Sequence, residues 1–163
     1  MSDIETLQKG WIFNEEWGFG GAAPEERDCE CWGRALLVCA NGDGHLSPEE
    51  RNWVLGYSAT NGVAPEHIEA LRTYKADEDL AKVIHESPVV EAKETHRALV
   101  YDVIRACAAD GELSTGERDN VYKMAELLGV DREIVDQLED AYHAEMAAKQ
   151  ARFKIAFPEG SPF

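Results

Sequence analysis

The fold is decided by one stretch, Asp110-Gly111-Glu112-Leu113-Ser114-Thr115-Gly116-Glu117-Arg118. A second copy lies 67 positions earlier and reads Asp43-Gly44-His45-Leu46-Ser47-Pro48-Glu49-Glu50-Arg51. Around the two copies, positions 39–74 and 106–141 align without a gap, and eleven of the 36 pairs are identical. A repeat at a fixed offset indicates that one structural unit occurs twice. Because a single unit cannot bury its own apolar face, we expect the two units to pack about a pseudo-two-fold axis.

Each copy carries the chemistry of a helix start. A serine is followed three positions later by a glutamate, Ser47 by Glu50 and Ser114 by Glu117. This pair is a capping box: the serine hydroxyl accepts a hydrogen bond from the glutamate N–H, and the glutamate carboxylate accepts one from the serine N–H. Helix starting therefore explains every motif position except the arginine.

The same letters also match the second half of a calcium-binding EF-hand loop. Asp43 falls at loop position 5 and Glu50 at position 12, but position 1, which requires aspartate, is Cys39. Calcium takes at least about six oxygen ligands. The first loop offers a partial set and the second offers mainly Asp110 and Glu117. Neither loop is a competent EF-hand on its own.

No segment shows the period-two alternation of a strand, so the predicted class is all-α. Apolar residues instead recur at spacings of three and four, as on one face of a helix. The first predicted helix begins near residue 28, and the others span 47–62, 66–74, 80–84, 89–108, 114–128 and 131–153. The helix over 89–108 is expected to be the longest, with Asp102 and Arg105 on its solvent face.

The chain divides into three segments. Residues 1–27 combine four aromatic residues with four glycines, which is poor material for a helix. We expect them to form an irregular strap whose rings pack over the core; the alternative is a partner-binding arm. Residues 28–155 should form the helical domain, and residues 156–163, with two prolines and a glycine, a non-helical tail.

The amino-acid composition limits the classes of ligand that the protein can bind. The chain has 163 residues, 44% of them apolar, and a formal net charge of −16, which indicates one folded and strongly acidic domain. A field of this sign repels phosphates and anionic lipids, so nucleic acid and membrane surfaces are excluded as direct ligands. No stretch approaches the ~20 apolar residues of a membrane span, and the N-terminus lacks the features of a signal peptide. We therefore expect a soluble, cytoplasmic protein.

The four cysteines are too few for a disulfide scaffold. Cys39 and Cys107 fall on apolar helix faces and are expected to be buried. Cys29 and Cys31 form a C-x-C pair of the kind found in zinc sites, but there is no second pair and no histidine at the usual spacing. The role of this pair stays open.

An all-helical chain with two D-G-x-x-S-x-x-E motifs, each after an Ala/Cys-rich helix end, resembles the TerB-like tellurite-resistance family. The likeness covers roughly residues 28–150 and is closest over Ala108-Ala109-Asp110-Gly111-Glu112-Leu113-Ser114. The N-terminal domain of membrane-anchored J-domain co-chaperones has similar motifs. This chain lacks the J-domain and the anchor, which favours a stand-alone protein.

The resemblance implies a compact bundle of about seven helices, built here from two related three-helix units. It also implies that a divalent metal, calcium or magnesium, binds to Asp43, Glu50, Asp110 and Glu117. Family members are linked to resistance to tellurium anions and to general stress, in protein complexes at the inner face of the membrane. His45 and the pair at 41–42 depart from the family pattern, which weighs against two symmetric metal sites.

Three functions remain open. The favoured one is a non-enzymatic module that binds a divalent cation through the motif carboxylates and serves in a stress-response complex. The second is a purely structural protein–protein interaction module whose motifs only cap helices. The third, least favoured, is a metal-dependent hydrolase that uses the same carboxylates. The sequence indicates neither the partner nor the oligomeric state.

Overall fold

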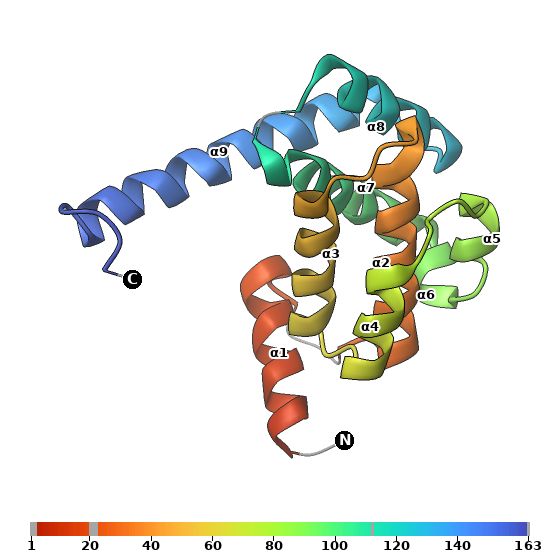
Figure 1. Cartoon of the computed structure of the whole chain (residues 1–163), viewed down its shortest axis with the longest axis horizontal. Helices are drawn as coiled ribbons and strands as arrows, with labels where there is room; N and C mark the ends of the chain where they lie inside the picture. Colours follow the sequence, from red (N-terminus) through yellow and green to blue (C-terminus); the bar gives the residue numbers. More distant parts are fainter. Residues whose placement is uncertain (1–2, 20–22, 112, 163) are drawn as a thin grey trace.

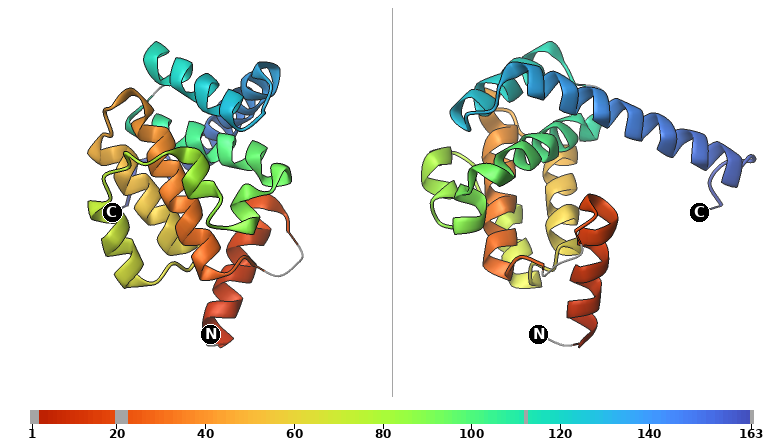
Figure 2. Two further views of the ribbon diagram at one scale, coloured as in Figure 1. Left: turned by 90° about the vertical axis from the view of Figure 1, so that its right-hand side faces the viewer. Right: turned by 180° about the vertical axis from the view of Figure 1, so that it is seen from behind.

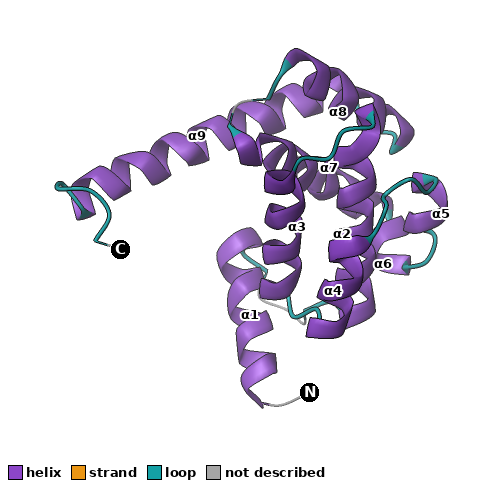
Figure 3. Ribbon diagram, viewed as in Figure 1, coloured by secondary structure: helices purple, strands orange, loops and turns teal. Residues whose placement is uncertain are grey.

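The computed structural model describes residues 3–19, 23–111 and 113–162, and every regular element within them is a helix (Figures 1 and 3). The predicted all-α class is confirmed. The α-helices are α1 Asp3–Trp17, α2 Glu26–Ala40, α3 Pro48–Thr60, α4 Pro65–Thr73, α5 Leu80–Ile84, α6 Pro88–Glu91, α7 Lys93–Cys107, α8 Thr115–Leu127 and α9 Arg132–Ala156. Two short 3-10 helices, η1 Asn41–Asp43 and η2 Ala108–Asp110, each end at the aspartate of a motif.

The repeat in the sequence is a repeat of three helices. In the first unit α2 leads through η1 to α3 and α4, and in the second unit α7 leads through η2 to α8 and α9. The contacts between the units are reciprocal: α2 packs against α7, α3 packs against η2, and α8 packs against η1. Such contacts are those of two units about a pseudo-two-fold axis. The connecting helices α5 and α6 cover α2.

Helix α2 lies at the centre of the bundle. Its last six residues, 35–40, are all buried, because α3, α5, α7 and α8 surround it. A helix that is apolar on every side needs neighbours on every side. Leu36 and Leu37 on α2 are fully buried, as is Leu99 on α7. Each such side chain contributes roughly 1.5–3 kcal/mol to the free energy of unfolding, so this packing holds the two units together.

Helix α1 covers Asp3–Trp17, so the predicted irregular conformation is wrong for this part of residues 1–27. The end of α1 is fixed to the bundle: the Trp17 ring meets Tyr101 edge-on at 5.8 Å between ring centres, and Glu16 pairs with Arg105 at 2.9 Å. These contacts offset the weak helix propensity of a segment that contains glycine and aromatic residues. Residues 1–2 and 20–22 of the predicted strap lie outside the described residues.

The segment predicted as one helix over 89–108 is two helices. Helix α6 ends and α7 begins on either side of Ala92, whose backbone is extended, with φ −63° and ψ 124°. The Thr95 hydroxyl donates to the carbonyl groups of Val89 and Ala92 at 2.8 and 2.7 Å and so holds the turn. The described residues contain nine α-helices rather than about seven, because α1 was not predicted and α6 and α7 were predicted as a single helix.

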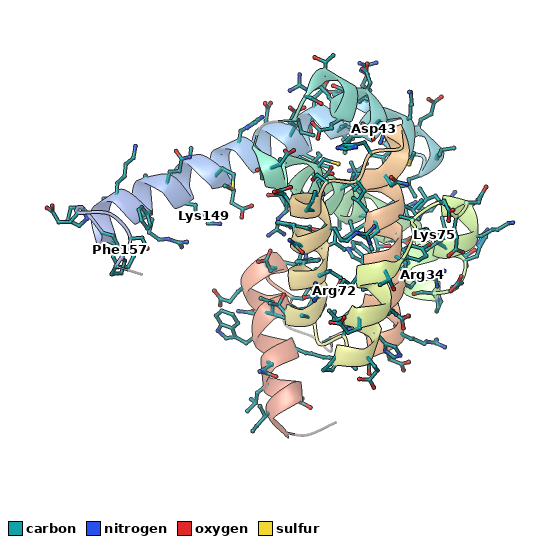
Figure 4. All side chains as sticks on the ribbon, viewed as in Figure 1. Arg34, Asp43, Arg72, Lys75, Lys149 and Phe157 are labelled. Atoms are coloured by element: carbon teal, nitrogen blue, oxygen red, sulfur yellow. The ribbon has the colours of Figure 1, made fainter. Side chains whose placement is uncertain are left out.

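Helix α9, with 25 residues, is the longest in the described part of the chain, and it ends one residue into the predicted tail of 156–163. Its first half packs against α7 and α8, and its second half projects away from the bundle (Figure 2). Lys149 and Phe157 mark the projecting part (Figure 4). Side chains 147–162 are all exposed. Among the described helices, none is both long enough and apolar enough to cross a membrane.

A buried ionic cluster joins α1, α2, α3 and α7. Asp102, expected on a solvent face, is fully buried; it accepts a hydrogen bond from Trp32 Nε1 at 3.0 Å and lies 3.3 Å from Arg105 Nη1. The Arg105 guanidinium also pairs with Glu16 and lies 5.2 Å from the centre of the Trp53 ring. Burial raises the pKa of Asp102 to about 6, although the charge of Arg105 favours the ionised form. One carboxylate therefore connects several helices.

Candidate metal centre at the motif loops

Both motifs turn after a short 3-10 helix, but the backbone conformations of their glycines differ: Gly44 is left-handed, with ψ 10°, whereas Gly111 has ψ −118°. In each, a 3-10 helix is followed by a glycine at positive φ, 83° at Gly44 and 151° at Gly111, where a side chain would be strained. In the first loop the Asp43 carboxylate accepts the N–H of His45 at 2.8 Å. Asp43 is exposed at the end of the bundle where α2 turns into α3 (Figure 4). The turn then leads directly into the next helix.

The predicted capping boxes are present in both copies. In the first, the Ser47 hydroxyl accepts the N–H of Glu50 at 3.1 Å, and Glu50 Oε2 accepts the N–H of Ser47 at 2.7 Å. In the second, the same two distances between Ser114 and Glu117 are 3.2 and 2.6 Å. The glutamates therefore start α3 and α8, whatever else they bind.

The motif arginines connect the second helix of each unit to the third. Their presence is not explained by the chemistry of a helix start. Arg51 donates to two carbonyl groups at the end of α4, at 2.9 and 3.0 Å. Arg118 instead pairs with the Glu139 carboxylate on α9, at 3.0 and 3.1 Å from its Nε. The position equivalent to Glu139 in the first unit is Arg72, so Arg51 has no such carboxylate to pair with. The sequence signal for this role was an arginine at the same place in both copies.

The two loops lie at one end of the bundle, which we call the motif pole: η1, η2 and the N-terminal ends of α3 and α8. Asn120 of α8 is buried there and crosses between the units, because its Nδ2 donates to the carbonyl oxygen of Cys39 at 3.2 Å. A Cβ atom added to Gly42 would lie 2.4 Å from the same Nδ2. The first motif departs from the family pattern at Gly42 for a steric reason. Asn120 occupies the space that a side chain at position 42 would fill.

Replacing Gly42 by alanine is expected to lower the free energy of unfolding by about 1–3 kcal/mol, because the new methyl group must displace Asn120. Gly56 is the matched control, since it lies on α3 with no neighbouring atom within 4 Å of an added Cβ. There the same substitution should stabilise the protein by roughly 0.5–1 kcal/mol, because alanine favours a helix interior. Urea unfolding of the two variants measures both effects, and equal effects would contradict the steric explanation.

Glu50 is the buried carboxylate of the motif pole, with 2% of its surface exposed. Burial raises its pKa, and the charges of Glu117 and Asp110, from the other motif, raise it further, against hydrogen bonds from Ser47 that lower it. None of these carboxylates, nor Asp43, forms an ion pair with a described cationic side chain. Negative charge gathered around a buried carboxylate is unfavourable, so a cation at this place would stabilise the fold.

The donor chemistry of the motif pole fits a hard cation, while the coordination shell is incomplete. Calcium and magnesium take carboxylate oxygens, and Glu50 and Glu117 each use only Oε2 in the capping box. Asp43 and Asp110 are exposed on their loops. In the part of the chain that is described, no three acidic, histidine or cysteine residues are grouped closely enough to hold an ion. Of the predicted residues, Glu117 and Asp110 thus lie near enough to Glu50 for their charges to act on it, and the described residues form no finished site.

Comparison with known proteins gives one informative match. No protein-family model and no curated protein matches the chain. Among solved structures, a tellurite resistance protein from Nostoc punctiforme is 44% identical, the match covers 100% of both chains, and the TM-score is 0.92. The chain belongs to the TerB-like tellurite-resistance family. The likeness predicted over residues 28–150 is therefore longer than expected, and it includes α1 and the projecting end of α9.

In this TerB-like chain all four cysteines are free and buried. Cys31 Sγ donates to the carbonyl oxygen of Val83 at 3.1 Å. Burial raises the pKa of Cys29 and of Cys31 to about 11, and that of Cys39 to about 12. Metals bind the thiolate, which these environments disfavour. The cysteines therefore suit packing better than zinc binding, and the carboxylates of the motif pole remain the candidate ligands.

Proposed function

We propose that this TerB-like protein binds a divalent cation at the motif pole and acts without catalysis in a stress-response protein complex in the cytoplasm. The observation that carries the proposal is Glu50, a buried carboxylate whose pKa is raised by burial and by the charges of Glu117 and Asp110. Both neighbours belong to the other repeat unit. A bound cation would supply the positive charge that offsets their repulsion.

The residues that would hold the cation are Glu50 and Glu117, through the oxygens that the capping boxes leave free, together with Asp43 and Asp110. The two aspartates are the exposed last residues of η1 and η2, so they would supply carboxylates from the surface rather than from the core. Calcium takes about six to eight oxygen ligands, so water would complete the part of the shell that these carboxylates leave open. Binding would connect the two units at the end where their sequences repeat.

Thermal and urea unfolding with calcium or magnesium, against a chelator, tests the proposal. A cation that binds only the folded protein should raise the free energy of unfolding by about 2.7 kcal/mol at a concentration 100 times its dissociation constant. Glu50→Gln and Asp110→Asn should each reduce this gain, while Glu126→Gln, on the exposed surface of α8, should leave it unchanged. Each comparison is made with and without metal in the same variant, because removing a charge here also relieves repulsion.

The absence of any stabilisation at millimolar calcium and magnesium would contradict cation binding. It would favour the second candidate, a purely structural interaction module, for which the specific observation is the projecting half of α9. Phe153 and Ile155 are exposed there, on the part of α9 that projects from the bundle. The net charge of −16 favours a protein partner, with basic groups, over nucleic acid.

A further inference from the structure

A second candidate site lies at the opposite end of α3 from the motif pole. A cavity of about 150 Å³, partly open to solvent, lies between the end of α1, the start of α2, the end of α3 and the start of α7. Aromatic rings make up much of its lining: Phe13, Trp17, Phe19, Trp32 and Tyr57. The motifs do not contribute to it, so whatever it binds is independent of the cation.

The aromatic walls are held in place from behind. Trp32 donates its Nε1–H to the buried Asp102 at 3.0 Å. Trp17 is fixed edge-on against Tyr101, with 5.8 Å between the ring centres, and stacks on Phe19 at 6.4 Å. A cavity with walls fixed by such contacts is already formed before a ligand arrives, and this lowers the entropy that binding must overcome.

Two polar groups in the lining already have partners within the protein. The Asp28 carboxylate accepts the hydroxyl of Ser87 at 2.7 Å, and the Thr95 hydroxyl donates to two backbone carbonyl groups. Asn61 lines the same cavity with only 6% of its surface exposed. Its backbone N–H donates to the carbonyl oxygen of Tyr57 at 3.0 Å, and its side-chain amide takes no part in the side-chain hydrogen bonds found among the described residues. Among the described residues, the fully buried side-chain atoms without a partner are the Tyr74 hydroxyl and His96 Nε2. The Asn61 amide is not one of them, so it is accessible from the cavity and can pair with a ligand.

We propose that this cavity binds a small, flat, mainly apolar molecule that carries one hydrogen-bonding group, and that the Asn61 amide recognises that group. An apolar cavity of about 150 Å³ has the size that accepts benzene in another protein, which limits the ligand to one or two fused rings. Mainly apolar walls with a few well-placed polar groups are the usual design of a small-molecule site. Phe13 and Trp17 of α1 cover the cavity, so a bound ligand also contacts α1.

Indole and indene test the proposal, because they have nearly the same shape and only indole has an N–H group. Titration followed by amide chemical shifts should show changes at residues around the cavity with both probes. Indole should bind about fivefold more tightly, which corresponds to one neutral hydrogen bond. Asn61→Leu, which keeps the size of the side chain, should abolish this preference and leave indene binding intact. A preference that survives in Asn61→Leu would overturn the role of the amide.

A cavity-filling variant tests the location. Ala98 of α7 lines the cavity, and Ala98→Leu should abolish the binding of both probes. Ala144→Leu, the same change on the exposed surface of α9, should leave binding unchanged. Circular dichroism checks that both variants are folded, and Asn61→Leu supplies an independent test if Ala98→Leu is not. Shifts that are absent with both probes at millimolar concentration, or that persist in a folded Ala98→Leu variant, would overturn the proposal.

Discussion

Replacing Asp102 by alanine should lower the free energy of unfolding by about 3–5 kcal/mol, the loss typical of breaking a buried ion pair. The substitution leaves the Trp32 N–H without its acceptor, and it leaves Arg105, with 14% of its side chain exposed, paired only with Glu16. Urea unfolding measures the effect. Asp140→Ala on the exposed surface of α9 is the control and should change the free energy by less than about 0.5 kcal/mol.

The pH dependence of stability gives an independent check on the same residue. Because burial raises the pKa of folded Asp102 to about 6, above its ordinary value of 3.8, the folded protein binds this proton more tightly than the unfolded chain does. This contribution to stability is fully present below about pH 4 and is lost as the pH rises through 6. Asp102→Asn removes the titrating group, so the free energy of wild type relative to Asp102→Asn should fall between pH 4 and 7. A constant difference would contradict the burial of this carboxyl group.

Leu36→Ala is expected to lower the free energy of unfolding by about 2–5 kcal/mol, because Leu36 is fully buried in the central helix α2. The lost methyl groups leave a cavity where the two repeat units meet, so the variant should weaken the contact between the units as well as α2 itself. Leu127→Ala is the matched control on α8, since Leu127 is 71% exposed. Denaturant unfolding of the two variants compares them directly, and a similar loss in both would contradict the central position of α2.

The helix starts were predictable because their chemistry is local. Ser47 and Glu50 are three residues apart, so a capping box can be inferred from the letters alone, and the same holds for Ser114 and Glu117. The burial of Asp102 was not predictable in this way. Its partner Trp32 lies 70 positions away in the sequence, and by helical spacing alone Asp102 falls on the charged face of α7. The helix α1 was missed for the same reason, because its anchors Tyr101 and Arg105 lie far along the chain.

The candidate site was likewise predictable from the sequence only in part. The sequence pointed to Asp43, Glu50, Asp110 and Glu117, and the structure shows that the charges of three of them act on one another across the two units. It also shows what no spacing indicates, that Asn120 occupies the space beside Gly42 and that Asn61 faces a cavity beneath α1. These contacts join different repeat units or different helices, and they exist only in the folded chain.

By itself the sequence determined the all-helical class, the duplication, the helix starts and the family, because each of these follows from residues that are close together or repeated at a fixed offset. The tertiary structure alone decided which carboxylates are buried, how α1 is held and where a cavity remains. Burial and charge proximity depend on segments that meet only in the folded chain. For that reason Asp102, which helical spacing placed in solvent, is fully buried and connects several helices of the bundle.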